Sequence, residues 1–263
     1  MMAPHALTAA LAALMVAQCA LGLLLPWQYR DPEWIKAAWF GNDCVTLVVA
    51  VPLVVVASEL ARRGSIRALL LWFGVLGYCV YNYAFYLFGA TLNTFFAIYV
   101  ASFVTSVITL ILALSRTDVA VVAAGFQRKV PMRILSGYLM FIGLGLACIW
   151  LTMWSAYAFA GKPTPVEPEA FKLVAALDLS LMVTTFIAGG SLLWRGAAWG
   201  YVIAAIGSIQ GALYLLVLTL SSFVAIRRNL VKAPGELPVW GILAAATIAA
   251  AALLLRDVRQ TKQ

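Results

Sequence analysis

Two aspartates stand within or beside long apolar stretches of the sequence, and they are the residues best suited to chemistry. Asp178 has apolar residues on both sides, and Asp43 opens an apolar run that contains Pro52. A carboxylate at the centre of a membrane span costs about 2.5 to 3.5 kcal/mol even on lenient scales. Asp178 is therefore predicted to bind an ion, a proton or a substrate, and a structural hydrogen bond to a neighbouring helix is the alternative. For Asp43 the alternative is a position among the lipid headgroups.

Amide and phenol side chains occur in the apolar runs near these aspartates. Helical spacing places Tyr78, Asn82 and Tyr86 on one face of the run that follows Arg67. An amide without a partner is costly in lipid, so Asn82 should point into a helix bundle. We expect the polar groups to line one cavity, with tyrosines around it. The predicted binding residues are Asp178, Asp43, Asn82, Gln210, Asn93, Tyr81 and Tyr86.

Two further patterns are weaker signals. Tyr99, Ser102, Ser106 and Thr109 recur at intervals of three and four, but hydroxyls can bond their own helix, so helix packing is the favoured interpretation. The Gly207–Gly211 pair has the GxxxG spacing that lets another helix approach closely.

Several kinds of site are not predicted. The chain has one histidine, His5, and four scattered cysteines: Cys19, Cys44, Cys79 and Cys148. This pattern argues against a metal, haem or redox site, and glycine-rich phosphate loops are absent, so no metal and no cofactor is expected. An Asp43–Asp178 pair would suit acid–base chemistry, as in intramembrane aspartyl proteases or carotenoid cyclases, but neither family's motifs surround them. Catalytic residues are therefore left unassigned.

Composition identifies an integral membrane protein. Of 263 residues, 64% are hydrophobic and only 11% charged, and the mean hydropathy is +0.98. Soluble domains carry about 25% charged residues, so this chain cannot cover its surface in water. The net charge of +8 is concentrated in short clusters between apolar runs, which indicates orientation in the membrane and no nucleic-acid partner.

Eight apolar runs predict an all-α polytopic bundle of about eight spans, each long enough for a bilayer. The runs cover residues 6–26, 43–60, 68–88, 94–114, 134–160, 171–193, 198–224 and 238–255. The first should be a retained span, because no Lys or Arg precedes it and Gln18 stands before Cys19 where a lipoprotein signal needs a small residue. Residues 27–42 mix charges with aromatics, which favours a loop or short helix at the headgroups, with a substrate lid as the alternative.

The order of features suggests an internal duplication within one transmembrane domain. Asp43 and Asp178 each open or enter a span, an Arg-Gly turn follows, and the next span carries amide and tyrosine groups. We expect two parallel four-helix repeats, residues 1–115 and 134–255, joined by a basic cytoplasmic loop at 115–133. Two unrelated hydrophobic hairpins are the alternative.

Basic residues predict which way the chain crosses the membrane. With eight spans and cytoplasmic termini, eleven of the 18 Lys and Arg residues lie inside and seven outside. The pair Arg227-Arg228 falls outside and is the exception. If one of the last runs fails to cross, the number of spans becomes seven.

Several short runs resemble those of an uncharacterised family of bacterial multi-pass membrane proteins. They are Gly41-Asn42-Asp43 followed by Thr46-Leu47 and Pro52, Tyr81-Asn82-Tyr83-Ala84-Phe85-Tyr86 with Asn93, and Trp199-Gly200-Tyr201. The resemblance implies a location in the bacterial inner membrane and no particular activity.

Three functions remain open from the sequence. The leading one is a small-molecule or ion transporter or channel with Asp178 as its charged ligand, so that Asp178→Asn abolishes flux while the protein still inserts. The second is a membrane-embedded enzyme acting on a lipid or isoprenoid. The third is a sensor or assembly subunit of a membrane complex. The expected partners are the lipid bilayer and a small-molecule or ion ligand, and the oligomeric state is not predicted.

Overall fold

The computed structural model describes residues 2–127, 129–231 and 235–259, and in these ranges the chain is a bundle of helices. Eight helical segments are long and apolar enough to cross a membrane, which confirms the predicted all-α polytopic fold. The spans are Ala3–Leu24, Glu33–Arg62, Ile66–Gly89, Phe96–Ser115, Met132–Ala160, Pro168–Trp194, Ala198–Arg227 and Leu237–Arg256.

Short connections join most of these helices. Helix α1 (Met2–Leu24) leads through the 3-10 turn η1 (Pro26–Gln28) into α2 (Glu33–Val45), and α3 (Val51–Arg62) turns at Gly64 into α4 (Ile66–Gly89). A six-residue turn, residues 90–95, separates α5 (Phe96–Ser115) from the end of α4. The second half contains α7 (Met132–Ala160), α8 (Pro168–Leu177), α9 (Thr184–Trp194), α10 (Ala198–Arg227) and α11 (Leu237–Arg256).

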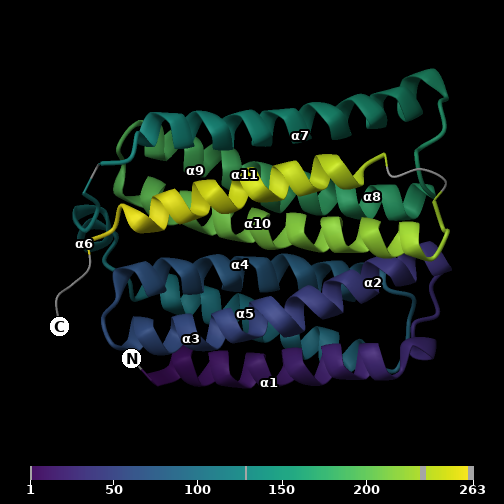
Figure 1. Cartoon of the computed structure of the whole chain (residues 1–263), viewed down its shortest axis with the longest axis horizontal. Coiled ribbons are helices and arrows are strands. Elements are labelled where there is room, and N and C mark those ends of the chain that lie inside the picture. The colour runs from purple at the N-terminus through teal and green to yellow at the C-terminus, as the bar shows by residue number, and fades with distance from the viewer. Residues whose placement is uncertain (1, 128, 232–234, 260–263) are drawn as a thin grey trace.

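Helices α4 and α10 occupy the centre of the bundle. They pack against each other, and they are the two most buried spans. Helix α4 also packs against α3 and α5, while α10 packs against α2, α9 and α11. Figure 1 shows α1 and α7 on opposite outer sides, with the start of α1 and the end of α11 at the same end of the bundle. We call this the terminal end, and the other the opposite end.

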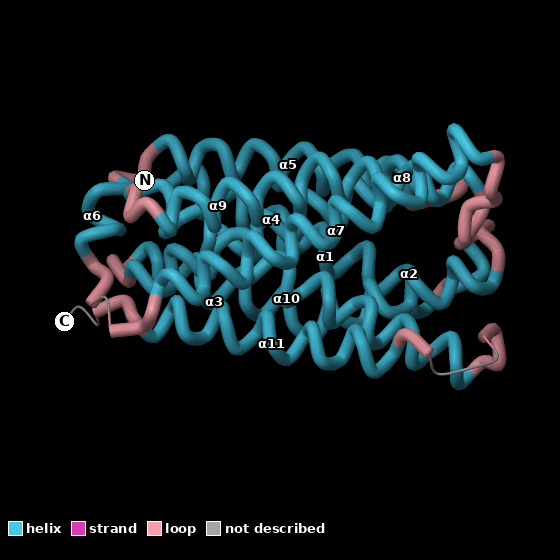
Figure 2. The backbone as a smooth tube through the Cα atoms, turned by 90° about the horizontal axis from the view of Figure 1, so that it is seen from above, coloured by secondary structure: helices cyan, strands magenta, loops and turns pink. Residues whose placement is uncertain are grey.

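The helices lie nearly along one direction, so every connection falls at one of these two ends (Figure 2). The turns at residues 25–32, 90–95 and 161–167 are at the opposite end, and so are residues 228–231 and 235–236. Because α10 and α11 both have the length of a span, Arg227 and Arg228 lie at the opposite end, away from the termini.

Two spans contain a π-helical segment, and each segment is next to an aspartate. Segment η2 (Thr46–Ala50) begins three residues after Asp43, and η3 (Asp178–Val183) begins with Asp178. Pro52 stands two residues after η2, and its ring can neither donate a hydrogen bond nor fit against the carbonyl one turn earlier. The wider π register is one way for a helix to accommodate this proline. The internal repeat stays a prediction.

The structure corrects two sequence-based boundaries. Residues 27–42 were expected to form a loop or short helix at the headgroups, but Glu33 already begins the second span. The charged and aromatic residues 33–40 obscured this start because they interrupt the apolar run. Asp43 is therefore ten residues inside a helix, not at its end. The loop predicted at 115–133 contains a short helix, α6 (Val119–Ala124), whose first amides donate to the Asp118 carboxylate.

The end of the chain is bound to the connection between α6 and α7. The backbone amides of Lys129 and Val130 donate to Asp257 Oδ1 at 2.8 and 3.0 Å. Val258 is fully buried, pairs with Phe126 as an isolated β-bridge, and accepts a hydrogen bond from Arg67 on α4. We call residues 125–127, 129–130 and 256–259 the clasp, because they connect α4, α7 and α11 at the terminal end.

Candidate functional site

Asp43 is the most completely buried carboxylate of the bundle, with 0% of its surface exposed. Three neutral donors bind it. Gln18 Nε2 and Tyr86 Oη donate to Oδ1 at 2.8 and 2.7 Å, and Tyr29 Oη donates to Oδ2 at 2.8 Å. They come from α1, from α4 and from the turn after α1. We call Gln18, Tyr29, Asp43 and Tyr86 the Asp43 cluster.

The helix face predicted on α4, with Tyr78, Asn82 and Tyr86, explains how this cluster is built. Tyr78, Asn82 and Tyr86 all bond the second span: Tyr78 Oη lies 2.8 Å from Thr46 Oγ1, Asn82 donates to that same oxygen at 3.4 Å, and Tyr86 donates to Asp43. Since residues four apart share a helix face, one face of α4 covers both α2 and η2. The predicted face is thus confirmed, and its hydrogen bonds fix the position of Asp43 along the axis of α4.

Gly22 provides the space that the Asp43 carboxylate occupies. A β-carbon at residue 22 would lie 2.2 Å from Asp43 Oδ2 and 2.4 Å from Tyr29 Oη. Both distances are far inside van der Waals contact, so only glycine fits here without moving the carboxylate or the phenol.

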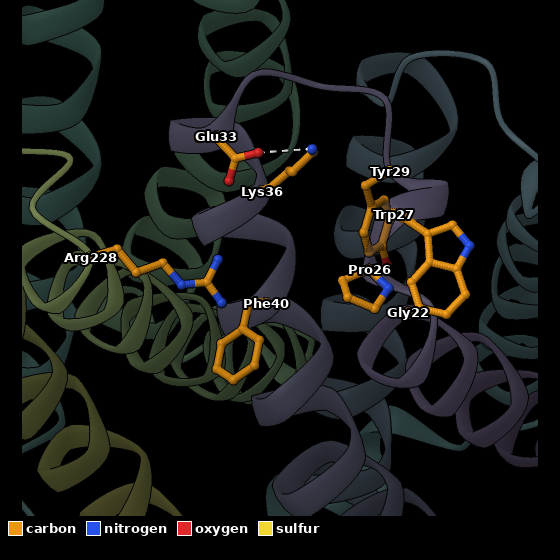
Figure 3. Close-up of a pocket in the computed structure, with 8 residues that line it drawn as sticks. All are labelled: Gly22, Pro26, Trp27, Tyr29, Glu33, Lys36, Phe40 and Arg228. Atoms are coloured by element: carbon orange, nitrogen blue, oxygen red, sulfur yellow. Dashed lines mark hydrogen bonds and ion pairs between the residues drawn. The ribbon is translucent and has the colours of Figure 1, made fainter.

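A pocket opens beside this cluster at the opposite end. Its volume is about 300 Å³. Figure 3 shows the Arg228 guanidinium near the Phe40 ring on one side, and Trp27, Pro26 and Tyr29 on the other. The pocket residues are Gly22, Pro26, Trp27, Tyr29, Glu33, Lys36, Phe40 and Arg228. Two of these, Gly22 and Tyr29, also line the Asp43 carboxylate, so a thin layer of side chains separates the pocket from a buried acid.

The two basic side chains of the pocket differ in whether an acid neutralises them. Lys36 forms a salt bridge of 2.9 Å with Glu33, whereas Arg228 has no salt-bridge partner among the described residues and stands 5.3 Å from the centre of the Phe40 ring. The pocket therefore carries one unbalanced positive charge beside aromatic surface. An anionic group or a flat apolar group would suit it.

Tyr29 is the connection between pocket and acid. Burial, and then the neighbouring Asp43 carboxylate, raise the pKa of the Tyr29 phenol well above its usual value. The phenol keeps its proton at any pH the protein meets, so it acts as a constant hydrogen-bond donor to Asp43.

Asp178 has a separate set of donors. Tyr81 Oη on α4 donates to Oδ1 at 2.6 Å, and Trp150 Nε1 on α7 donates to Oδ2 at 2.9 Å. The carboxylate is 1% exposed. Tyr214 on α10 packs its ring against Tyr81, with 5.0 Å between ring centres. We call Tyr81, Trp150 and Asp178 the Asp178 cluster.

The predicted residues do not form one hydrogen-bonded group. Tyr86 joins Asp43, and Tyr81 joins Asp178, but no hydrogen bond between described residues connects the two clusters. Gln210 donates to the sulfur of Met182 at 3.2 Å and lies against Gly77 between α10 and α4. Helix α4 presents Tyr81 and Tyr86, five residues apart, on different sides. That all these residues line one polar cavity stays a prediction.

Asn82 and Asn93 have structural bonds as well. Asn82 donates to Thr46, as described above. Asn93 accepts a hydrogen bond of 2.8 Å from the Phe95 amide in the turn before α5, and its own Nδ2 has no protein partner although the residue is 9% exposed.

Three important residues were not found from the sequence. Gln18 is an amide in the middle of the first span, a signal as strong as that of Asn82, but it was considered only for its place before Cys19. Tyr29 and Asp31 were assigned to the membrane interface. Asp31 accepts hydrogen bonds from Trp39, from the Thr91 amide and from the Thr91 hydroxyl, which connects the pocket region to the α4–α5 turn.

Metal ligands do not gather in the described ranges: no three His, Cys, Asp or Glu side chains come together there as a bound ion would need. That the protein has no metal and no cofactor stays a prediction.

Comparisons of the chain with protein-family models, with curated proteins and with solved structures find no match. The resemblance to an uncharacterised bacterial membrane family therefore stays a prediction, and function must be inferred from the site itself.

Proposed function

We propose that this integral membrane protein is a transporter of a small solute or ion, and that its binding site is the pocket together with the Asp43 cluster. One observation supports this most: Tyr29 and Gly22 line both the pocket and the buried Asp43 carboxylate. Ionisable groups inside a membrane are costly and typically mark ion or substrate pathways. An acid that can be reached from one end through a single layer of side chains suits such a pathway.

The chemistry of the pocket favours a small anionic solute with an apolar or aromatic part. Arg228 would pair with the anionic group, and Trp27 and Phe40 would cover the apolar part. In this proposal Asp43, rather than Asp178, is the acid nearest to the solute, which differs from the choice made on sequence alone. Asp178 keeps the role of a second intramembrane acid.

The enzyme alternative is less well supported. Acid–base catalysis by two carboxylates needs both within reach of one substrate. Asp43 and Asp178 belong to separate clusters with different donors, and neither contacts the other. The sensor alternative gains no specific support from the geometry.

Currents from a solid-supported membrane carrying the reconstituted protein test the proposal. The probes would be aromatic and aliphatic carboxylates, amines, sugars, Na⁺ and K⁺. We expect a current with at least one carboxylate, and its loss in Asp43→Asn and in Arg228→Gln. Glu169→Gln is the matched control, since Glu169 is an exposed acid that, among the described residues, forms an ion pair with Lys172 alone.

Two results would count against this site. If Asp178→Asn abolishes the current and Asp43→Asn does not, the solute binds at the other cluster. If no probe produces a current or a thermal shift in the protein, transport through this pocket is the wrong function.

A further inference from the structure

Four buried polar atoms near the Asp43 cluster have no hydrogen-bond partner in the protein. They are Tyr83 Oη on α4, Tyr99 Oη and Ser102 Oγ on α5, and Asn93 Nδ2 in the turn between these helices. The four residues are 0, 2, 0 and 9% exposed, respectively. Two other such atoms occur in the described chain, on Arg67 and Ser221, so four of the six belong to α4, α5 and the turn between these helices.

Two of the four groups lie beside Tyr86, which donates to Asp43. The Tyr86 ring stacks on Tyr99, with centres 5.0 Å apart, and lies 6.1 Å from the Tyr83 ring. Ser102 is one helical turn beyond Tyr99 on the same face of α5. Asn93 stands at the opposite end, so the groups extend from that end of the bundle inward along α5.

Unpartnered hydroxyls and amides are rare in folded proteins, because each loses its hydrogen bonds to water on burial and gains nothing in return. Lipid tails cannot supply partners. Water can, provided that a buried site is polar and offers a molecule two to four partners, and such waters are a regular part of protein interiors. The hydroxyls of Tyr83, Tyr99 and Ser102 both donate and accept, as bound water requires.

We propose that a chain of bound water molecules fills this region between α1, α4 and α5, satisfies Asn93, Tyr99, Ser102 and Tyr83, and carries protons between the opposite end and Asp43. The coupling ion of the transporter is then the proton. The role of the proton in transport rests on the proposed function, but the water chain itself can be tested independently.

The proton transfer is simple to balance. A hydronium ion of the chain gives up one O–H bond, and a new O–H bond forms on Asp43, which becomes a neutral acid; release reverses both changes. The three donors leave one lone pair of the carboxylate, on Oδ2, for that proton. A neutral Asp43 would no longer repel the anionic solute that Arg228 attracts.

Groups that titrate around Asp43 are all weak acids. They are Cys19 from α1, Tyr29 from the turn after it, Cys44 from α2, Tyr78, Tyr83 and Tyr86 from α4, and Tyr99 from α5. From α10, Ser221 packs against Gly41, and Arg228, just beyond the helix, reaches only the pocket. No hydrogen bond or salt bridge from a Lys, Arg or His reaches Asp43 among the described residues. A proton from water is therefore the natural means of neutralising it.

Radiolytic hydroxyl-radical labelling of the full protein in nanodiscs tests the water chain, because radicals made from bound water modify the side chains beside it. We expect Tyr83 and Tyr99 to be labelled at rates comparable with exposed Tyr157. Met182 and Phe73, which are equally buried, should stay unlabelled. If Tyr83 and Tyr99 are as protected as Met182, the water chain does not exist.

The double variant Tyr83→Phe/Tyr99→Phe provides a second measurement. With water present, we expect unchanged or lower thermal stability, slower proton exchange measured with a pH dye inside proteoliposomes, and unchanged solute binding at the pocket. If the hydroxyls had no partner, removing them would stabilise the protein, and this result would overturn the proposal.

These outcomes separate the two proposals. Labelled tyrosines without any solute current would contradict transport but keep the water chain. Solute currents without labelled tyrosines would keep transport and exclude a proton supply along α5.

Discussion

Both intramembrane acids are held by neutral donors rather than by cations. Asp43 accepts from an amide and two phenols, and Asp178 from a phenol and an indole. A permanent salt bridge would fix the charge of each acid, whereas neutral donors can hold the carboxylate and still allow its protonation. This is the arrangement expected of an acid that changes state during a cycle.

Gly22 is the residue on which the Asp43 cluster most directly depends. In Gly22→Ala, the added methyl must displace the Asp43 carboxylate or the Tyr29 phenol, so we expect the free energy of unfolding to fall by about 1 to 3 kcal/mol. Denaturant titration in mixed micelles measures it. Gly145→Ala is the control, because nothing lies within 4 Å of its β-carbon position. Equal stability of the two variants would show that the cluster is looser than described.

Tyr81 should matter to Asp178 through its hydroxyl alone. Tyr81→Phe keeps the ring that packs on Tyr214 and removes the 2.6 Å hydrogen bond. We expect a loss of about 1 to 2 kcal/mol in the free energy of unfolding, as for other strong hydrogen bonds in membrane bundles. Tyr157→Phe, at an exposed position on α7, should change nothing. No loss in Tyr81→Phe would mean that Trp150 alone is enough to hold the acid.

At the scale of helices, the π-helical segments place the acids. Each shifts the register of a span next to an aspartate, and π segments are often found at functional sites. Pro52 is visible in the sequence of the second span. A π-helical segment itself has no sequence signature apart from such a proline, so it could not be predicted. The apolar length of each span was predictable because it follows from bilayer thickness.

What could not be predicted was the pairing of side chains between helices. The face Tyr78–Asn82–Tyr86 followed from helical periodicity and proved correct. The partners of Asp178 did not follow, because an indole such as Trp150 in an apolar run is ordinarily a packing residue. Hydropathy also fails to detect the start of a span that is rich in charged and aromatic residues, such as residues 33–40.

The clasp is an element whose loss should be measurable. Asp257→Ala removes the acceptor for the Lys129 and Val130 amides, so we expect a fall of about 1 to 3 kcal/mol in the free energy of unfolding. Glu169→Ala, at an exposed acid in the first turn of α8, serves as the control. Limited proteolysis should also cut at residues 125–127 and 129–130 faster in Asp257→Ala. Unchanged stability and proteolysis would show that the clasp contributes nothing.

At the scale of the whole molecule, α4 and α10 form the central pair and the remaining spans surround them. Large apolar side chains cover the outside, among them Phe159 at 80% and Phe141 at 73% exposure, as a lipid-facing surface requires. Helix α4 contributes a donor to both acids, so a movement of α4 relative to α10 would affect both clusters together. Alternating access by the two halves would use this pair as its axis.

The two ends of this bundle differ in charge, and this predicts its orientation. The terminal end contains Arg62, Arg63 and Arg67, while the pocket with its acid Glu33, and the nearby Asp31, lie at the opposite end. By the positive-inside rule, the terminal end should face the cytoplasm and the pocket the outside. In a variant with all four native cysteines replaced by serine, Lys162→Cys should react with an impermeant maleimide on intact cells, and Thr117→Cys only after permeabilisation. The reverse labelling would place the pocket in the cytoplasm and make the protein a candidate exporter, because the solute would then bind from inside.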